Sequence, residues 1–183
     1  VAVNYPLAPE VAMDRIVASC RQAIIWVYRN IAPYNGDPNK IYISGHSAGG
    51  HLVAMLMTTN WPALAADLPP NLIKGGCAIS GLFNLIPVQL SYVNEDVRLD
   101  EAMTRRNSPQ FLPPACHSPL IVAVGGAESE EYLAQSHDFA SAWSQQGVPI
   151  SEIIVPGANH FSILDHLADN ASLNRAILAQ MGL

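Results

Sequence analysis

The sequence carries little charge for its length. Asp, Glu, Lys and Arg make up only 13% of its 183 residues, against about 25% in a typical soluble domain, while half of the residues are hydrophobic. This balance excludes a disordered chain, which would combine low hydrophobicity with high charge. Nine basic residues face 15 acidic ones, the net charge is −6, and no basic cluster occurs. We therefore expect neither a nucleic acid nor a membrane surface as a partner.

Cysteine is scarce, and no uninterrupted hydrophobic run is long enough to span a membrane. Cys20, Cys77 and Cys116 are odd in number and lack CxxC spacing, which argues against a disulfide framework and favours a reducing, cytoplasmic compartment. Residues 41–66 are uncharged, but glycines, a proline and polar side chains interrupt them, whereas a membrane helix needs about 20 predominantly apolar residues. Because the chain begins at Val1 in a strand-like run, we expect a piece of a longer protein.

Short apolar runs typical of strands alternate with segments of helical periodicity. We expect strands at 1–5, 40–45, 73–80, 119–125 and 150–155, and helices at 11–32, 48–59, 98–106, 130–146 and 172–182. This alternation predicts a single α/β domain over residues 1–183, with a mainly parallel sheet and helices on both faces. The long connection 81–117 has little strand character, and such connections often line a site. We expect it to be a cap-like, lid-like or site-lining insertion.

One motif within this pattern of expected strands and helices indicates catalysis. The stretch Gly45-His46-Ser47-Ala48-Gly49 matches G-x-S-x-G, with an expected strand running into it and an expected helix running out. That context is the one a nucleophile elbow requires. We predict that Ser47 is a nucleophile and that the backbone N–H of Ala48, at the start of the helix, donates to an oxyanion.

A serine needs a base, and His160 is the best-placed histidine. It follows the expected strand 150–155 in a short loop, so it should share the carboxyl edge of a parallel sheet with Ser47. His46 and His51 are close to Ser47 in sequence, but we expect them to pack or to form the wall of a substrate pocket.

The base in turn needs an acid that orients it. Glu128 is the first acid after the strand 119–125 and lies between Ser47 and His160 in sequence, the order Ser, acid, His. Glu130 is the alternative, although an acid in the first turn of a helix is also favoured by the helix dipole alone. No pair of histidines has HExxH spacing and no Cys–His cluster occurs, so we expect no metal and no cofactor.

With these residues in view, the chain resembles the α/β-hydrolase superfamily, and within it the esterase and arylformamidase (kynurenine formamidase-like) branch. Four stretches carry the resemblance: the elbow, which extends to G-H-S-A-G-G-H-L, and Y-P-L-A-P-E (5–10), S-G-L-F-N-L (80–85) and N-H-F (159–161). The stretch that begins at Glu128 resembles the arylformamidase pattern D-S-P-E-F-x-x-Q-S, which implies that Glu128 is the catalytic acid, as Glu where Asp is usual.

The family also carries an H-G-G-[GY]-x-W motif upstream of the region where this chain begins, and that motif supplies oxyanion donors. No such motif occurs here. The resemblance therefore implies an N-terminally truncated α/β-hydrolase, its C-terminal two-thirds, in which Ala48 is the recognisable oxyanion donor.

These observations lead to a serine hydrolase that cleaves a small carboxylic ester or an aryl formamide through Ser47, His160 and Glu128. Phe83, Tyr92 and Trp61, together with His46, are candidates for the wall of the substrate pocket, with core packing as the alternative for the aromatic residues. Two other functions stay open: a catalytically impaired scaffold that binds a small ligand, and a thioesterase or acyltransferase with the same triad. The oligomeric state is also open, with a homodimer as one candidate.

Overall fold

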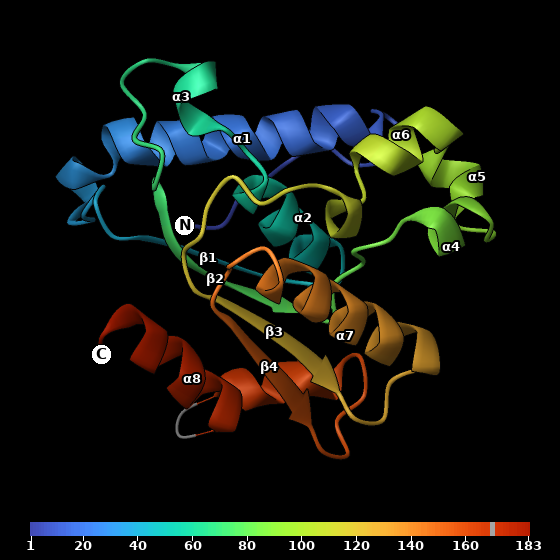
Figure 1. Cartoon of the computed structure of the whole chain (residues 1–183). Coiled ribbons are helices and arrows are strands. Elements are labelled where there is room, and N and C mark those ends of the chain that lie inside the picture. The colour runs from blue at the N-terminus through green and yellow to red at the C-terminus, as the bar shows by residue number, and fades with distance from the viewer. Residues whose placement is uncertain (169–170) are drawn as a thin grey trace.

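The computed structural model describes residues 1–168 and 171–183. Within them the chain forms a sheet of four parallel strands in the order β1-β2-β3-β4 (Figure 1). The strands are β1 (Ile41–His46), β2 (Ile73–Ile79), β3 (Leu120–Gly125) and β4 (Ile150–Val155). Every residue of β3 is buried, as expected for a strand that helices cover on both faces. The prediction of a parallel α/β sheet is confirmed.

The prediction of a strand over residues 1–5 is wrong. This segment is irregular, and Val1 is 86% exposed. A run of β-branched residues forms a strand only where a neighbouring strand pairs with it, and the described sheet ends at β1 without pairing to this segment. The long edge of β1 that faces away from β2 is therefore open.

Helices cover both faces of the sheet. On one face, α2 (Ala48–Met57) packs on β1 and β2 and α7 (Glu130–Ser144) packs on β3 and β4, and the two helices share a cluster around Val53, Met57 and Trp143. On the other face lie η3 (Ser162–Leu167) and α8 (Ser172–Met181). The remaining helices are α1 (Met13–Asn30), η1 (Ala32–Tyr34), α3 (Trp61–Leu64), α4 (Ile86–Gln89), α5 (Asn94–Val97), α6 (Glu101–Arg106) and η2 (Pro109–Phe111).

The long helix α1 forms an outer layer that packs on α2 (Figure 1). Its apolar residues recur at three- and four-residue steps, so they form one stripe along the helix. Ile16, Cys20 and Ile24 from this stripe meet Leu52 and Leu56 of α2 in a shared cluster. Through α2, this layer supports the segment that follows the serine motif.

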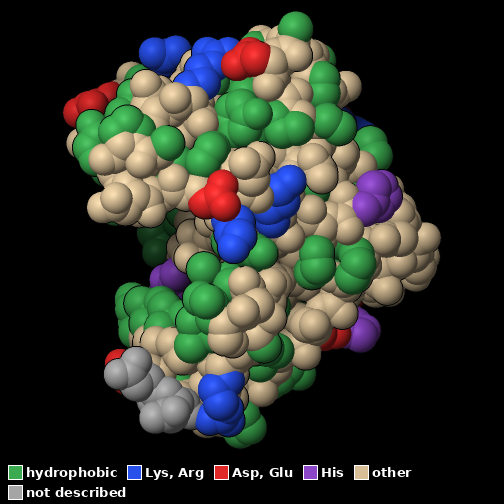
Figure 2. All heavy atoms as spheres, turned by 90° about the vertical axis from the view of Figure 1, so that its left-hand side faces the viewer, with side chains coloured by type: hydrophobic (Ala, Val, Ile, Leu, Met, Phe, Trp, Pro, Cys, Tyr) green, Lys and Arg blue, Asp and Glu red, His purple; other side chains and the backbone are tan. Residues whose placement is uncertain are grey.

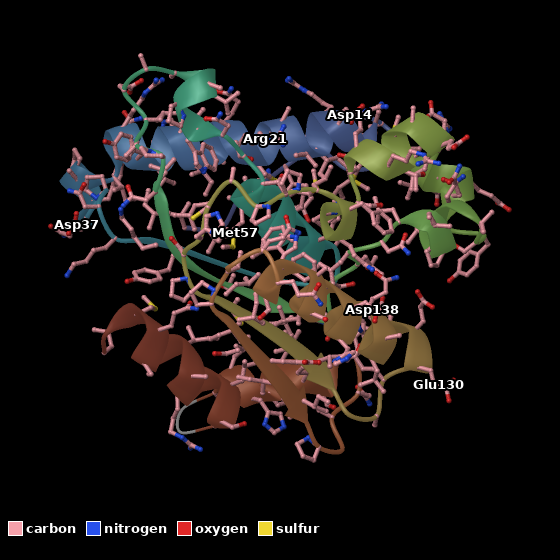
Figure 3. All side chains as sticks on the ribbon, viewed as in Figure 1. Asp14, Arg21, Asp37, Met57, Glu130 and Asp138 are labelled. Atoms are coloured by element: carbon pink, nitrogen blue, oxygen red, sulfur yellow. The ribbon has the colours of Figure 1, made fainter. Side chains whose placement is uncertain are left out.

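The segment 81–117 folds into α4, α5, α6 and η2 and is fixed to the helical layer. The indole Nε1 of Trp143 donates to the carbonyl of Pro109 over 3.1 Å, and the amide oxygen of Gln135 accepts from the backbone N–H of Phe83 at 2.8 Å. Arg106 forms an ion pair with Asp14, which lies at the start of α1 beside α6 (Figure 3). That this segment acts as a cap stays a prediction.

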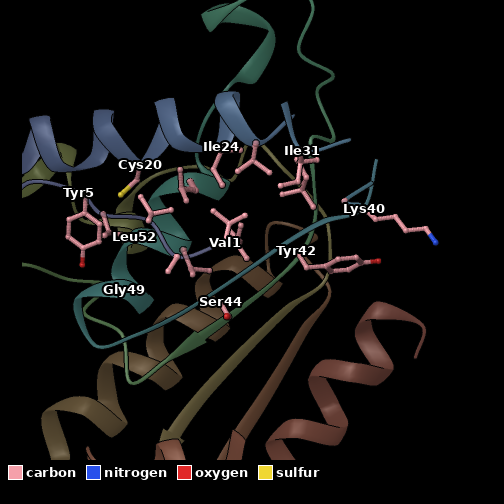
Figure 4. A pocket seen from close by; sticks show the side chains of 18 of the residues that line it. Val1, Tyr5, Cys20, Ile24, Ile31, Lys40, Tyr42, Ser44, Gly49 and Leu52 are labelled. Carbon is pink, nitrogen blue, oxygen red and sulfur yellow. The ribbon is translucent and has the colours of Figure 1, made fainter. Parts of the chain in front are cut away.

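Two cavities lie in the described part of the molecule. One, of about 670 Å³, lies between α1 and the open edge of β1 and reaches Gly49 at one end (Figure 4). Its wall includes the N-terminal residues and the apolar side chains of Ile24 and Leu52. The other, of about 810 Å³, lies against α6 and η2. The described helices include none with the length and hydrophobicity needed to cross a bilayer.

The aromatic stack that α7 forms with Phe83 should be a main source of stability. Phe139 is fully buried, stacks on Phe83 with ring centroids 4.0 Å apart, and contacts Trp143. We predict that Phe139→Ala lowers the free energy of unfolding by about 3–5 kcal/mol, because a buried aromatic ring leaves a cavity. Urea denaturation measures this. Phe111→Ala, at a half-exposed position, is the matched control, and an equal loss in both variants would contradict the packing.

A buried histidine should make stability depend on pH. His51 in α2 is buried, its Nε2 lies 2.7 Å from the carbonyl oxygen of Asn107, and burial lowers its pKa to about 4. The unfolded chain, with an ordinary histidine pKa of about 6.5, then binds a proton that the folded chain excludes. Stability should fall by about 3 kcal/mol as the pH falls from 6.5 to 4. In His51→Asn, the free energy of unfolding should change less between pH 6.5 and pH 4 than in the wild type. His137→Asn, at an exposed site, should keep the pH dependence of the wild type. Equal pH dependence in wild type and His51→Asn would refute this account.

Candidate active site

The carboxyl ends of all four strands meet at one edge of the sheet, and each leads into a segment that carries a polar side chain. Ser47 follows β1, Ser80 follows β2, Glu128 follows β3 and His160 follows β4. Parallel strands place such segments side by side. Ser47, Glu128 and His160 are thus brought together from positions up to 113 residues apart.

Ser47 occupies a strained turn between β1 and α2. Its φ is +56° and its ψ is −117°, a conformation that is uncommon for a residue with a side chain. The turn is held by a 2.8 Å hydrogen bond from the Ser47 N–H to the carbonyl of Ile79. A Cβ on Gly45 would lie 2.3 Å from the carbonyl oxygen of Gly49, so only glycine fits there, whereas a Cβ on Gly49 would meet open space. These features are those of a nucleophile elbow.

The three predicted residues form a continuous chain of hydrogen bonds. The Oγ of Ser47 lies 3.0 Å from Nε2 of His160, and Nδ1 of His160 lies 2.7 Å from Oε2 of Glu128. A carboxylate accepts the Nδ1 proton, which leaves Nε2 free to accept from the serine hydroxyl. The Glu128 side chain is fully buried, and that of His160 is 23% exposed, so the base is reachable while the acid is shielded.

Glu128 is held by more than the histidine. Its Oε1 accepts from the hydroxyl of Ser80 at 2.5 Å and from the backbone N–H of Gly125 at 2.8 Å. Buried carboxylates need such donors, because an unpaired buried charge is costly. Glu130, the alternative acid, instead lies exposed in the first turn of α7 and points away from the sheet (Figure 3). The geometry therefore favours Glu128 over Glu130.

Ser80 is a residue of the site for which the sequence argument gave no role. It is fully buried and adopts a φ of +49° directly after β2, while its N–H donates to the carbonyl of Ala123. A non-glycine residue in this left-handed region is uncommon and often marks a functional position. The sequence signals were its place at the carboxyl end of a strand and its place at the start of S-G-L-F-N-L (80–85). Neither signal reveals the contact with Glu128, since a backbone angle cannot be inferred from residue type.

His46 contacts the base rather than an open pocket. Its Nε2 lies 2.7 Å from the backbone carbonyl oxygen of His160, and the two ring centroids are 4.5 Å apart. Burial, together with the neighbouring His160, lowers the pKa of His46, so the ring is neutral at pH 7 and can donate to that carbonyl. His46 thus helps to fix the loop that carries His160, and a contact with substrate stays a prediction.

Two of the expected pocket residues are core residues. Phe83 and Trp61 have no exposed surface, and Phe83 stacks on Phe139, so neither side chain offers a face to a ligand. The expectation that they line the substrate pocket is corrected to core packing, because Trp61 and Phe83 each lie within a cluster of buried apolar side chains. Tyr92, between α4 and α5, is 84% exposed, and its role in substrate binding stays a prediction.

Ala48 is the first residue of α2. A helix leaves its first N–H groups without an intrahelical acceptor, and the positive end of the helix dipole lies at the same place. Ala48 can therefore donate to a negatively charged oxygen beside Ser47. Among the described residues, no three His, Cys, Asp or Glu side chains converge in a way that would hold a metal ion.

Known proteins share this arrangement of elements. The chain is 34% identical over 189 residues to kynurenine formamidase from Salmo salar and 34% identical over 188 residues to that from Danio rerio, and both alignments cover the whole chain. A crystal structure described as a thioesterase from Silicibacter sp. tm1040 superposes with a TM-score of 0.79 over 96% of the chain at 29% identity. The fold is that of an α/β-hydrolase, and the sequence is similar to the esterase and arylformamidase branch.

These similarities confirm the resemblance inferred from the motifs. The BD-FAE family model matches residues 1–75, and esterase LipQ from Mycobacterium tuberculosis (strain ATCC 25618 / H37Rv) is 27% identical over 175 residues, which cover 87% of the chain and 42% of LipQ. The chain spans 62% of the length of both kynurenine formamidases and of the Silicibacter protein.

The role of Ser80 can be tested by removing its hydroxyl. In Ser80→Ala the buried Oε1 of Glu128 would keep only the N–H of Gly125. We predict a loss of about 1–3 kcal/mol in the free energy of unfolding and a slower reaction of Ser47 with a fluorophosphonate, because hydrogen bonds to charged groups contribute about this much. Urea denaturation and mass spectrometry measure the two effects. Ser129→Ala, at an exposed position in the loop that carries Glu128, should change neither quantity. If Ser80→Ala leaves both the stability and the labelling rate unchanged, the hydrogen bond from Ser80 contributes to neither.

Proposed function

We propose that the chain is a serine hydrolase that cleaves small carboxylic esters or aryl formamides through an acyl-enzyme. The observation that carries this proposal is the continuous chain of hydrogen bonds from Ser47 through His160 to Glu128. A binding module would need neither of these two contacts, whereas nucleophilic catalysis by serine needs both.

In the first half of the reaction, Ser47 Oγ attacks the carbonyl carbon of the substrate. A bond forms between Oγ and that carbon, the π electron pair of the carbonyl moves to its oxygen, and the hydroxyl proton passes to His160 Nε2. The N–H of Ala48 stabilises the oxyanion, and Glu128 stabilises the charged imidazole. When the tetrahedral intermediate collapses, the bond to the leaving oxygen or nitrogen breaks and His160 returns the proton to that atom.

Water completes the cycle. It attacks the acyl carbon while His160 takes one of its protons, and the second tetrahedral intermediate breaks its bond to Oγ. The electron pair stays on Oγ, which takes the proton back from His160. The acid is released and the free serine is restored, so the net reaction is the addition of water across the ester or amide bond.

The substrate class rests on the relatives. Kynurenine formamidases of two fishes match the whole chain at 34% identity, which supports an aryl formamide, and matched esterases support a short ester. The ratio of kcat/KM for N-formylkynurenine to that for p-nitrophenyl acetate separates the two. A thioester is the second candidate, favoured by the Silicibacter protein described as a thioesterase.

The proposal includes a small-molecule substrate, a reducing cytoplasmic location, and neither a nucleic acid nor a membrane as partner. Cys20, Cys77 and Cys116 are free and buried, which supports a compartment where thiols stay reduced. On the face that Figure 2 shows, Lys and Arg side chains lie in separate places rather than in one patch. That arrangement gives little attraction to polyanions. A homodimer stays an open candidate.

The nucleophile can be tested directly. We predict that Ser47→Ala abolishes hydrolysis of either substrate class and leaves the free energy of unfolding within about 1 kcal/mol, since the hydroxyl makes no core contact. Intact-mass spectrometry should show one fluorophosphonate adduct per wild-type chain, mapped to the peptide with Ser47, and none in the variant. Ser44→Ala, at an exposed position, serves as control. Turnover that persists in purified Ser47→Ala would overturn the proposed function.

A further inference from the structure

The imidazole of His160 is contacted by the rings of two side chains that belong to other elements. Tyr132, in the first turn of α7, lies with its ring centroid 4.6 Å from that of His160 and its plane tilted by 40°. His46, at the end of β1, lies with its centroid 4.5 Å away and its plane tilted by 44°. Separations of this size are typical of packed aromatic rings. In the part of the chain that the structure describes these two rings do not contact each other, so they approach the imidazole from different directions.

The two rings are held by regular elements, whereas His160 lies in a loop. Helix α7 packs on β3 and β4, and its buried apolar side chains share a core cluster with those of β3, so the start of the helix is fixed relative to the sheet. His46 is the last residue of β1. Phe161 also contacts the imidazole, edge-on with centroids 5.6 Å apart, but it is next to His160 in the loop and would move with it. Tyr132 and His46 therefore restrain the imidazole from outside its own loop.

These ring contacts matter most in the acyl-enzyme. In the resting site two hydrogen bonds already hold the imidazole, from Nε2 to Ser47 and from Nδ1 to Glu128. Once Oγ of Ser47 carries the acyl group it has no proton to donate, so only the bond to Glu128 remains and the imidazole is free to rotate about it. The same imidazole must then take a proton from water while the water oxygen forms its bond to the acyl carbon. A contact on the ring itself limits that rotation.

We propose that Tyr132 is a positioning residue for the catalytic base, whose ring holds the imidazole of His160 in place while Ser47 is acylated. The Tyr132 side chain is half-buried, so its ring is packed beside the base rather than extended into solvent. The contact is made by the ring, and the hydroxyl is not required for it. This inference rests on the proposed acyl-transfer function and concerns its second half. Its consequence is that loss of the ring slows deacylation more than acylation.

The test separates the ring from the hydroxyl and one step from the other. Tyr132→Ala removes the ring, and Tyr132→Phe keeps it. With saturating p-nitrophenyl acetate, the first release of p-nitrophenol gives the acylation rate, and the decay of the acetylated chain in rapid-quench intact-mass spectrometry gives the deacylation rate. In Tyr132→Ala we expect deacylation to fall about 10- to 100-fold, because misplacing a catalytic group by about 1 Å can cost about 10²-fold. Acylation should fall by less than about threefold, because both hydrogen bonds of His160 still hold the imidazole in that step. Tyr132→Phe should match the wild type in both steps.

Further variants separate a loss of positioning from a loss of folding. Tyr132→Leu keeps an apolar side chain on α7 but lacks the ring, so it should show the same imbalance between the two steps as Tyr132→Ala. Both rates are first-order in the chains that react, so a partly unfolded sample changes the amplitudes and not the ratio of the rates. Tyr34→Ala removes a tyrosine ring at an exposed position in η1 and should leave both rates unchanged.

The outcomes distinguish this inference from the proposed function. If deacylation of Tyr132→Ala stays within twofold of the wild type, or falls no more than acylation, the ring does not position the base and the inference is overturned, while the hydrolase function stands. Deacylation of Tyr132→Phe as slow as that of Tyr132→Ala would assign the effect to the hydroxyl and also overturn the inference. A wild-type chain that is never acetylated at Ser47 would refute the proposed function and the inference together.

Discussion

The site depends on a geometric constraint: four parallel strands end at the same edge of one sheet. Each end delivers one polar side chain, and the contacts among Ser47, Ser80, Glu128 and His160 all lie along that edge. The two buried central strands carry the acid and its serine partner, while the outer strands carry the nucleophile and the base. Helices α2 and α7 pack on one face and η3 and α8 on the other, so the hydrophobic core holds the strands in register and thereby sets the distances of the site. A substitution in the core that shifts a strand is therefore expected to change the distances among the catalytic residues and so the rate of the reaction.

Strained backbone and burial both occur among the residues of the site. Ser47 and Ser80 both have a positive φ, and such backbone conformations persist only where the surrounding structure determines them. Burial shields the Glu128 carboxylate, and three donors satisfy it: the Ser80 hydroxyl, the Gly125 N–H and the His160 Nδ1. The result is an acid held in one position and a base that keeps one tautomer. Catalysis by such a site derives from donors that are already in place before charge develops.

The sequence predicts the regular elements and the triad because each follows from a local pattern. The strand expected at 119–125 is Leu120–Gly125 and the helix expected at 130–146 is Glu130–Ser144, since an all-apolar run and a helical periodicity are both visible without tertiary contacts. The strand expected at 1–5 is absent, because pairing requires a neighbour that composition does not reveal. Phe83 looked like a pocket residue and is core, since a loop aromatic may face either way. Ser80 was missed because its role depends on a backbone angle and on a contact with Glu128, 48 residues further along the chain.

The central claim is that the ends of β3 and β4 hold Glu128 and His160 in a short hydrogen bond that poises the base. Proton NMR of the wild-type chain at low temperature tests it most directly. We predict one strongly downfield imidazole proton, from His160 Nδ1–H, which His160→Gln and Glu128→Ala remove and His137→Asn leaves in place. A spectrum without this resonance, from a chain shown by its other signals to be folded, would contradict the assembled triad.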